Sequence, residues 1–345
     1  MRKRFKLLCF LLVLLTVLTF PVYAESGRLV AVGRTVGLEL ALDGVYVVKF
    51  DADKGAAPAQ EAGIKIGDQI VSVNGTALRR SEELRNAIIQ GHGADLIFRV
   101  RRGEKDMSFT VRPTFAGTAW RIGIYVQDRI AGLGTVTYYN PETGRFGALG
   151  HGVNTAGFLP AVRSGSATES EITSVQKGKT GRPGELLGSS LPDEPIGLVD
   201  ACTDRGIFGH SDKRLQGSDV AVAEREEITT GPAEILCNVA GTSVQAYSVE
   251  IEGLSFGSEA CKNLRLHITD PALLEQTGGI VQGMSGSPIL QNGKLIGAVT
   301  HVLVQDPTRG YGIYIRNMLS AEEGSPSETF DAEALTDWPA ASLPL

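Results

Sequence analysis

From Trp120 onward the chain is a series of short strand-like segments separated by turns, and no long stretch has the apolar spacing of a helix. Segments such as "RIGIYVQD", "SVQAYSVEIEG" and "KLIGAVTHVLV" are rich in the β-branched and aromatic residues that favour strands. The turns are explicit, because "NPETGRF" contains Pro141 and Gly144 and "QNGKL" contains an Asn-Gly pair. About 200 residues with this pattern predict a pair of antiparallel β-barrels.

Residues 28–113 predict a separate α+β domain that precedes the barrels. The segment "SEELRNAIIQG" predicts a helix that starts at Ser81 as N-cap and ends at Gly91. The stretch "AGIKIGDQIVSVNG" joins a helix end, a strand and a tight turn in that order. This stretch resembles the PDZ domain.

The PDZ resemblance implies a peptide-binding site. In such domains an extended peptide adds a strand to a sheet edge, and backbone N–H groups of a short loop hold its carboxylate. The segment "TVGLEL" lies where that loop is expected, with Gly37 allowing close backbone approach. The predicted peptide-binding residues are Val36, Gly37, Leu38 and Leu40. The alternative is an ordinary hairpin edge without a ligand.

The N-terminus has the pattern of an export signal. Four basic residues within the first six are followed by an apolar run from Leu7 to Phe20 and by Ala24 at the -1 position. The run is shorter than the roughly 20 residues of a stable membrane span. Residues 1–25 are therefore expected to export the protein, either as a cleaved signal peptide or as a retained membrane anchor.

Composition excludes several classes of function. The net charge is -6 with a pI near 5.5, and no basic stripe is present, which argues against nucleic-acid binding. The exported part contains Cys202, Cys237 and Cys261 without the spacing of a zinc site, so they are interpreted as buried thiols, with one disulfide left open. "KGKTGRPGELLG" lacks the spacing of a phosphate loop. We expect no metal and no organic cofactor.

The stretch "GGIVQGMSGSPIL" places Ser285 in a glycine-rich bend before an apolar strand. It resembles the nucleophile loop of chymotrypsin-like serine proteases. A tetrahedral oxyanion requires two backbone N–H groups that point into one small space. The predicted donors are the N–H groups of Gly283 and Ser285, and Gly286 is expected to keep the far side of the loop open.

A serine nucleophile needs a base, which is commonly a histidine. The chain has five histidines: His92, His151, His210, His267 and His301. Only His151 lies early enough in the barrel region to match a template with the histidine in the first barrel and the serine in the second. His301 has a plausible supporting role beside the serine loop.

The acid that orients the imidazole remains open from the residues alone. The aspartates between the pair include Asp193, Asp200, Asp204, Asp212, Asp219 and Asp270. Asp270 ends a strand and precedes Pro271, which would fix its side chain at a barrel rim.

The order of "GALGHGV", "ITSVQKGKTGRPGELLG", "HITD" and "GMSGSPI" after a PDZ domain resembles the SpoIVB peptidase family. The resemblance implies a serine endopeptidase with a chymotrypsin-like double β-barrel over residues 114–320. It assigns the catalytic triad to His151, Asp270 and Ser285. The acidic segment 321–345 is expected to be a flexible tail.

The resemblance also implies a biological role. In that family the peptidase is exported into the space between the forespore and mother-cell membranes, where it stays membrane-anchored until it cleaves itself. It then cleaves a membrane-tethered regulatory subunit of a metalloprotease complex, which triggers sigma-factor processing. The PDZ ligand is expected to be the chain's own N-terminal region. The alternatives are a non-catalytic PDZ scaffold and a general quality-control protease of the envelope.

Overall fold

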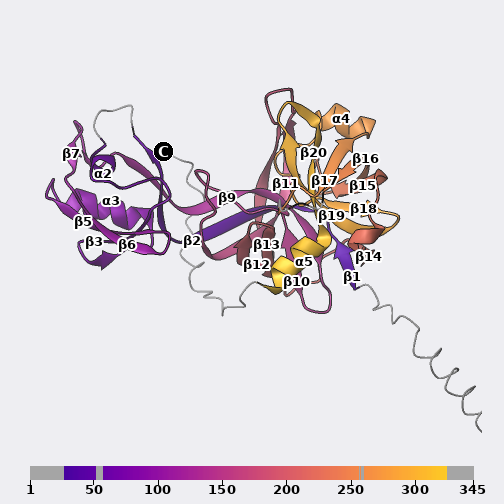
Figure 1. Cartoon of the computed structure of the whole chain (residues 1–345), viewed down its shortest axis with the longest axis horizontal. Coiled ribbons are helices and arrows are strands. Elements are labelled where there is room, and N and C mark those ends of the chain that lie inside the picture. Colours follow the sequence, from indigo (N-terminus) through magenta and orange to yellow (C-terminus); the bar gives the residue numbers. More distant parts are fainter. Residues whose placement is uncertain (1–26, 52–56, 256, 258–259, 325–345) are drawn as a thin grey trace, which may run out of the picture.

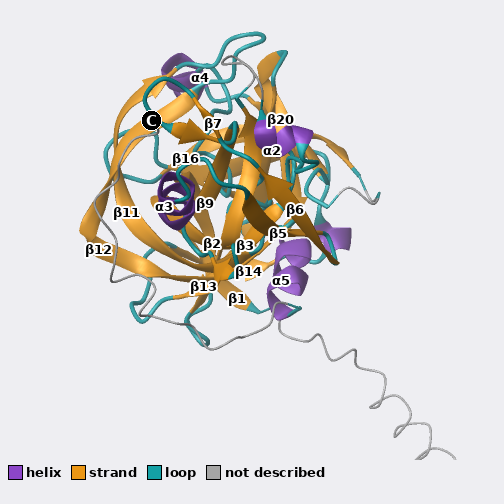
Figure 2. Cartoon of the chain, turned by 90° about the vertical axis from the view of Figure 1, so that its left-hand side faces the viewer, coloured by secondary structure: helices purple, strands orange, loops and turns teal. Residues whose placement is uncertain are grey.

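The computed structural model describes residues 27–51, 57–255, 257 and 260–324. The predicted export segment and nearly all of the predicted tail lie outside these ranges. Figure 1 shows a smaller and a larger body joined by two long strands, β2 (Thr35–Phe50) and β9 (Ile124–Tyr139). Strands dominate both bodies, and the helices are short (Figure 2). The predicted mostly β fold class is therefore confirmed.

Barrel 1 is a closed circuit of six antiparallel strands. β2 pairs with β9, β9 with β10, β10 with β13, β13 with β12, β12 with β11, and β11 returns to β2. Its core contains Val36, Leu40, Phe146, Val199 and Ile207. The other strands are β10 (Arg145–Ala148), β11 (Val162–Gln176), β12 (Glu185–Thr203) and β13 (Gly206–His210).

Barrel 2 is a second closed circuit of six antiparallel strands. β15 pairs with β16, β16 with β17, β17 with β20, β20 with β19, β19 with β18, and β18 returns to β15. The strands are β15 (Gly231–Cys237), β16 (Gln245–Leu254), β17 (Leu264–Ile268), β18 (Pro288–Gln291), β19 (Lys294–Leu303) and β20 (Asp306–Tyr314). The helix α4 (Pro271–Thr277) lies between β17 and β18 in the chain. The predicted pair of barrels is present.

A third apolar cluster joins the barrels. β1 (Arg28–Ala31) pairs with β9 of barrel 1 and with β14 (Ser218–Val222), and β14 pairs in parallel with β19 of barrel 2. The cluster contains Tyr138, Phe208 and Ile313, together with Met318 of α5 (Ile315–Glu323). α5 therefore extends the folded peptidase region past residue 320, where the flexible tail was expected to begin. A short 3-10 helix, η2, spans Arg225–Glu227.

The PDZ domain has its own core, which includes Val47, Ile70, Leu84 and Phe98. It is built from the second half of β2, the first part of β9, and the intervening elements. Helix α3 starts one residue earlier than expected, with Arg80 and not Ser81 at the N-cap, and the Glu83 carboxylate accepts from the Arg80 N–H. The elements are α2 (Pro58–Glu61), β3 (Gln69–Val73), β4 (Thr76–Ala77), α3 (Ser81–Gln90), β5 (Leu96–Arg102), β6 (Lys105–Val111), β7 (Thr114–Phe115) and β8 (Trp120–Arg121).

The PDZ domain is inserted within barrel 1 and does not simply precede it. The segment 35–41 of β2 pairs with β9 on one edge and with β11 on the other, so it is a central barrel strand. The PDZ pairings of β2 begin only at Val45. The prediction that the PDZ domain starts at residue 28 therefore included strands that the structure places in the peptidase domain.

No helix in the described ranges is long and apolar enough to cross a membrane. Within the described ranges, Cys202, Cys237 and Cys261 form no disulfide with one another.

Candidate active site

Ser285 lies in a tight loop between α4 and β18. Within this loop the Met284 N–H donates to Val281 O, and the Ser287 N–H donates to Met284 O at 3.0 Å. The N–H groups of Gly283 and Ser285 donate to no acceptor among the described residues. Two uncommitted donors on either side of Met284 are compatible with the predicted oxyanion site, which needs two free N–H groups.

Barrel 1 holds this loop in place through two buried threonines of β9. Thr135 Oγ1 donates to Gly283 O at 2.8 Å, and Thr137 Oγ1 donates to Gly286 O at 2.8 Å. The Thr135 N–H also donates to Ser285 O at 2.9 Å. Each barrel therefore contributes to the geometry of the loop, and no sequence signal had singled out either threonine.

Gly286 is required for contact between the barrels. Its φ is +95°, and a Cβ there would lie 2.0 Å from Thr135 O and 2.6 Å from Leu149 N. From the sequence, Gly286 was expected to keep the far side of the loop open. The structure corrects this, because that side is filled by the backbone of barrel 1.

The Ser285 hydroxyl donates to the carbonyl oxygen of Thr300 on β19 at 2.9 Å. In this arrangement the proton of the nucleophile is held by a backbone acceptor. The side chain is partly exposed, so it is accessible from solvent. Catalytic hydrogen bonds commonly form only when substrate is bound, which leaves room for rotation of the hydroxyl toward a base.

His151 lies in the loop that follows β10. Leu149 and Gly150 both have positive φ, and the Leu149 N–H donates to Thr135 O. This turn brings Gly150 against β19, since a Cβ on Gly150 would lie 3.0 Å from Thr300 Cγ2. The structure therefore brings His151 and Ser285 to the same short stretch of β19 from opposite barrels.

The imidazole of His151 is partly buried, and two groups fix its surroundings. Nδ1 lies 2.9 Å from Gly152 O, which places the proton on Nδ1 and leaves Nε2 as the acceptor. The ring of His301 is 5.0 Å away, centroid to centroid. Burial lowers the pKa of His151 below its ordinary value, against the smaller raising effect of the Gly152 carbonyl. The imidazole is thus held neutral, as a general base requires.

Asp270, the third predicted residue of the triad, lies at the junction of β17 and α4. Its carboxylate is the N-cap of α4, where it accepts from the N–H groups of Ala272 and Leu273, at 2.9 and 3.1 Å. The residue thus ends a strand and starts a helix, and its role as the orienting acid stays a prediction.

The predicted PDZ loop is also placed elsewhere. Val36, Leu38 and Leu40 point into the core of barrel 1, and Gly37 packs against Ser190. Both edges of this segment are occupied by β9 and β11, so it offers no backbone N–H groups to a ligand. The prediction of a carboxylate-binding loop at these residues is wrong. Its apolar alternation reflects a barrel strand.

The loop after His151 contacts the PDZ domain. Thr155 Oγ1 donates to Gln127 Oε1 of β9 at 2.5 Å, and the ring of Phe158 lies 5.5 Å from that of Tyr46. The Asp43 N–H donates to Ala161 O. These contacts lie within ten residues of His151, which connects the PDZ domain to the catalytic loop.

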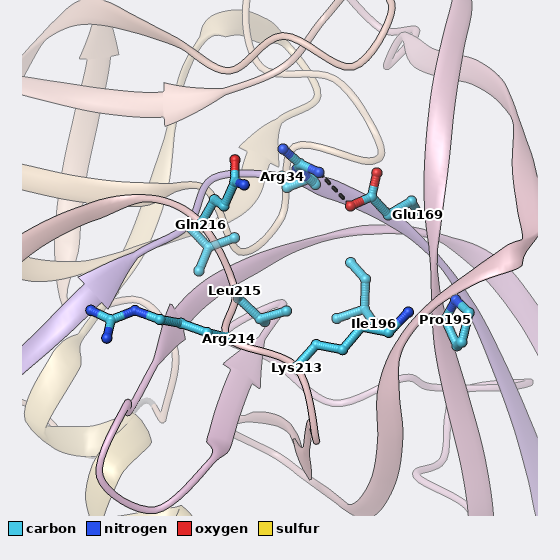
Figure 3. Close-up of a pocket in the computed structure, with 9 residues that line it drawn as sticks. Arg34, Glu169, Pro195, Ile196, Lys213, Arg214, Leu215 and Gln216 are labelled. Carbon is cyan, nitrogen blue, oxygen red and sulfur yellow. Dashed lines mark hydrogen bonds and ion pairs between the residues drawn. The ribbon is translucent and has the colours of Figure 1, made fainter.

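A separate hollow lies on barrel 1 near the start of β2 (Figure 3). Arg34 and Glu169 form an ion pair across it, and Lys213, Arg214 and Gln216 line its other side. Neither His151 nor Ser285 lines it. Among the described residues, no group of three or more histidine, cysteine or acidic side chains is arranged to hold a metal ion.

Comparisons with known proteins agree with this architecture. A family model described as SpoIVB peptidase S55 matches residues 118–319, and a PDZ-domain model matches residues 32–112. Serine protease HTRA3 of Rattus norvegicus is 39% identical over 70 residues, and serine protease HTRA1 of Xenopus tropicalis is 37% identical over 70 residues. In each case the match covers 20% of this chain and 14% of the relative.

Two solved structures are similar in part. The PDZ domain of the SdrC-like protein Lmo2051 from Listeria monocytogenes is 27% identical, with coverage of 25% of this chain and 90% of that chain and a TM-score of 0.22. The active form of the Rv3671c protease from M. tuberculosis is 14% identical, with coverage of 59% and 76% and a TM-score of 0.33.

Proposed function

The chain belongs to the SpoIVB peptidase S55 family, and from this premise we propose that it is a sporulation signalling serine endopeptidase that cleaves itself and then a membrane-tethered regulatory protein. One observation supports the catalytic part above all others. The backbone N–H groups of Gly283 and of Ser285 itself donate to no described acceptor, and the His151 loop reaches the stretch of β19 that binds the Ser285 hydroxyl from the other barrel.

The proposed reaction is acyl transfer. The Ser285 hydroxyl leaves Thr300 O, gives its proton to His151 Nε2, and forms a bond to the carbonyl carbon of the substrate. The Gly283 and Ser285 N–H groups donate hydrogen bonds to the oxyanion. His151 then returns the proton to the leaving amine as the peptide C–N bond breaks. Water hydrolyses the acyl-enzyme through the same base and the same oxyanion site.

The PDZ domain is proposed to hold an extended segment of substrate. The part of β9 from Ile124 to Gln127 pairs with β2 on one edge, and no described strand pairs with its other edge. A peptide that adds to this edge would lie close to the Gln127 contact with the catalytic loop. The proposed ligand is the chain's own N-terminal region, before self-cleavage releases the protein from the membrane.

The proposed site of action is the space between the forespore and mother-cell membranes. The support is the export pattern of residues 1–25 together with the family, and the proposed substrate is a regulatory subunit of a membrane metalloprotease complex. Selective cleavage of one tethered partner would separate this role from general quality control. Extensive digestion of unfolded casein would instead favour a quality-control protease.

The test compares the full-length chain with its Ser285→Ala variant. Purified proteins are incubated, and mass spectrometry identifies new N-termini that form over time. We expect new termini upstream of the PDZ domain in the wild type and none in Ser285→Ala. Ser248→Ala, which removes an exposed hydroxyl from β16, serves as the matched control and should process normally. Equal processing in wild type and Ser285→Ala would favour the non-catalytic scaffold.

A further inference from the structure

The hollow on barrel 1 has an apolar floor and a basic rim. Its volume is about 340 Å³. Val32, Ile196 and Leu215 supply the apolar floor, and the first two are buried. Lys213 and Arg214 supply the basic rim (Figure 3). A pocket of this kind can hold one large apolar side chain together with a charged neighbour.

The lining of the hollow is positively charged overall. The Glu169 carboxylate is paired with Arg34, which neutralises its charge. Lys213 and Arg214 are exposed, and neither side chain has an acidic partner among the residues that the structure describes. Two unpaired cations above an apolar floor favour a ligand that carries carboxylates next to an apolar group.

The backbone that carries the two cations is fixed. The hydroxyl of the buried Ser211 donates to Ile196 O, and the Lys213 N–H donates to Ser211 Oγ at 3.2 Å. The Ser211 N–H in turn donates to Gly144 O at 2.9 Å. The rim is therefore held against the floor before any ligand binds, which lowers the entropic cost of binding.

The segment that follows α5 has the matching composition. Residues 325–345 contain four acidic residues and no lysine or arginine. Trp338 follows Asp337, so a large apolar side chain stands next to a carboxylate. A tryptophan that stays in water exposes a large apolar area, which favours its burial. The four acidic residues are Glu328, Asp331, Glu333 and Asp337.

The end of α5 lies close to the hollow. Glu322 Oε1 accepts from Arg145 Nε at 2.8 Å, and Arg145 pairs with His210. Lys213 follows His210 by three residues, which is at most about 11 Å of chain. The chain between the end of α5 and Trp338 can extend to roughly 50 Å, so it is long enough to reach the hollow.

We propose that the acidic segment 325–345 folds back onto barrel 1 and docks in this hollow. The Trp338 indole lies on the apolar floor, and the neighbouring carboxylates pair with Lys213 and Arg214. The contact is intramolecular, because a segment tethered to α5 has an effective concentration on the order of millimolar. This inference goes beyond the proposed peptidase function and does not depend on it.

The hollow adjoins the part of β9 that supports the serine loop. Val32 and Arg34 both line the hollow. The Val32 N–H donates to Thr137 O at 3.1 Å, and the Val136 N–H donates to Arg34 O at 2.9 Å. Thr137 is one of the two threonines whose hydroxyls hold the serine loop. The docked segment therefore contacts residues that are bonded directly to this support.

The first test measures the exposure of Trp338 in the full-length protein. The chain has two tryptophans, so Trp120→Phe leaves Trp338 as the only one and serves as the parent protein. Quenching of its fluorescence by acrylamide is compared between the parent protein and the double charge reversal Lys213→Glu/Arg214→Glu. The melting temperature and the intact mass of each protein show that it is folded and that it retains residues 325–345.

The matched control is the double charge reversal Lys65→Glu/Lys105→Glu in the parent protein. It makes the same change in net charge at two exposed positions of the PDZ domain. We expect the variant of the hollow to raise the quenching constant of Trp338 by at least about twofold, because the indole leaves its apolar contacts. The PDZ control should be quenched like the parent protein. Salt at about 1 M should also raise quenching in the parent protein, since it screens the ion pairs.

The second test identifies the partners of Lys213 in the wild-type chain. A water-soluble carbodiimide links an amine to a carboxylate that is in contact with it, and peptide mapping of the monomer band by mass spectrometry locates each link. We expect Lys213 to be linked to an acidic residue of the segment 325–345. Lys105 is the internal control and should give no such link.

Two outcomes would overturn the inference. Equal quenching of Trp338 in the parent protein, the variant of the hollow and the PDZ control would show that the segment does not dock there. A link between Lys213 and the segment that occurs only in cross-linked dimers would assign the hollow to the segment of a second copy. Neither outcome bears on the serine nucleophile, which self-processing tests separately.

Discussion

The Ser285 hydroxyl donates a hydrogen bond to the Thr300 carbonyl, and the ring of His301, the residue after Thr300, lies against the ring of His151. One short segment of β19 thus touches both the nucleophile and the base. Neither contact joins Ser285 to His151 directly. The resting site is therefore assembled around β19, and attack requires the serine hydroxyl to exchange a backbone acceptor for the imidazole.

Gly286→Ala is expected to disrupt the interface between the barrels. The new methyl group would overlap Thr135 O and Leu149 N, both of them backbone atoms that cannot move independently, and the residue would keep a positive φ. We expect a loss of more than about 3 kcal/mol in the free energy of unfolding. Chemical denaturation of the purified variant measures it.

The matched control is Gly293→Ala in the β18–β19 turn. Gly293 also has a positive φ of +75°, but a Cβ there would meet no described atom within 4 Å. The free energy of unfolding of Gly293→Ala should fall by only about 1 kcal/mol, which is the cost of the backbone conformation. Equal losses in the two variants would show that the contact with barrel 1 contributes nothing.

The sequence predicted those features that depend on neighbouring residues. Alternating apolar residues and glycine turns indicated the barrels, and the spacing of Gly283 and Ser285 indicated an oxyanion loop. Both are local, because a strand pattern and a tight bend are encoded within about ten residues. The placement of His151 in the first barrel followed from its position in the chain.

Features that depend on distant pairing were not predicted correctly. An aspartate before a proline has the same sequence pattern whether it is a catalytic acid or a helix N-cap, and the N-cap of α4 at Asp270 could not be predicted from that pattern. The apolar alternation around Leu38 fits a PDZ edge or a barrel strand equally well, and only pairing with β11 distinguishes them.

Thr135→Val should weaken the serine loop. Valine keeps the shape of threonine but removes the hydroxyl that donates to Gly283 O, and this leaves a buried carbonyl without that donor. We expect a loss of about 1–3 kcal/mol in unfolding free energy together with slower labelling of Ser285 by a fluorophosphonate. Thr135→Ser, which keeps the hydroxyl, should retain most of the unfolding free energy and most of the labelling rate. A valine variant that labels at the wild-type rate would contradict a role for Thr135 in shaping the oxyanion site.

Cys237 should resist thiol reagents in the folded protein. Burial raises its pKa to about 12, against a lowering hydrogen bond from Ser287, so almost no thiolate forms at neutral pH. Cys261 is partly exposed and should be alkylated by N-ethylmaleimide under the same conditions. Peptide mapping by mass spectrometry checks both, and denatured protein serves as the control in which both thiols react. Rapid modification of Cys237 would show that barrel 2 opens often enough to expose this buried thiol to the reagent.

The stability of the fold should depend on pH through His151. Burial lowers the pKa of its imidazole in the folded state below the ordinary value of about 6.5 that applies to the unfolded chain. Below that value the unfolded chain binds more protons than the folded protein, so the stabilisation is present at neutral pH and is lost as the pH falls. The free energy of unfolding of the wild type should therefore decline more steeply than that of His151→Gln between neutral pH and about pH 5. Urea denaturation of both proteins across this range measures the two slopes, and the remaining histidines, present in both, cancel in the comparison. Parallel curves would mean that the imidazole of His151 is no harder to protonate in the folded protein than in water, and the neutral base required for attack by Ser285 would then have to come from another feature of the site.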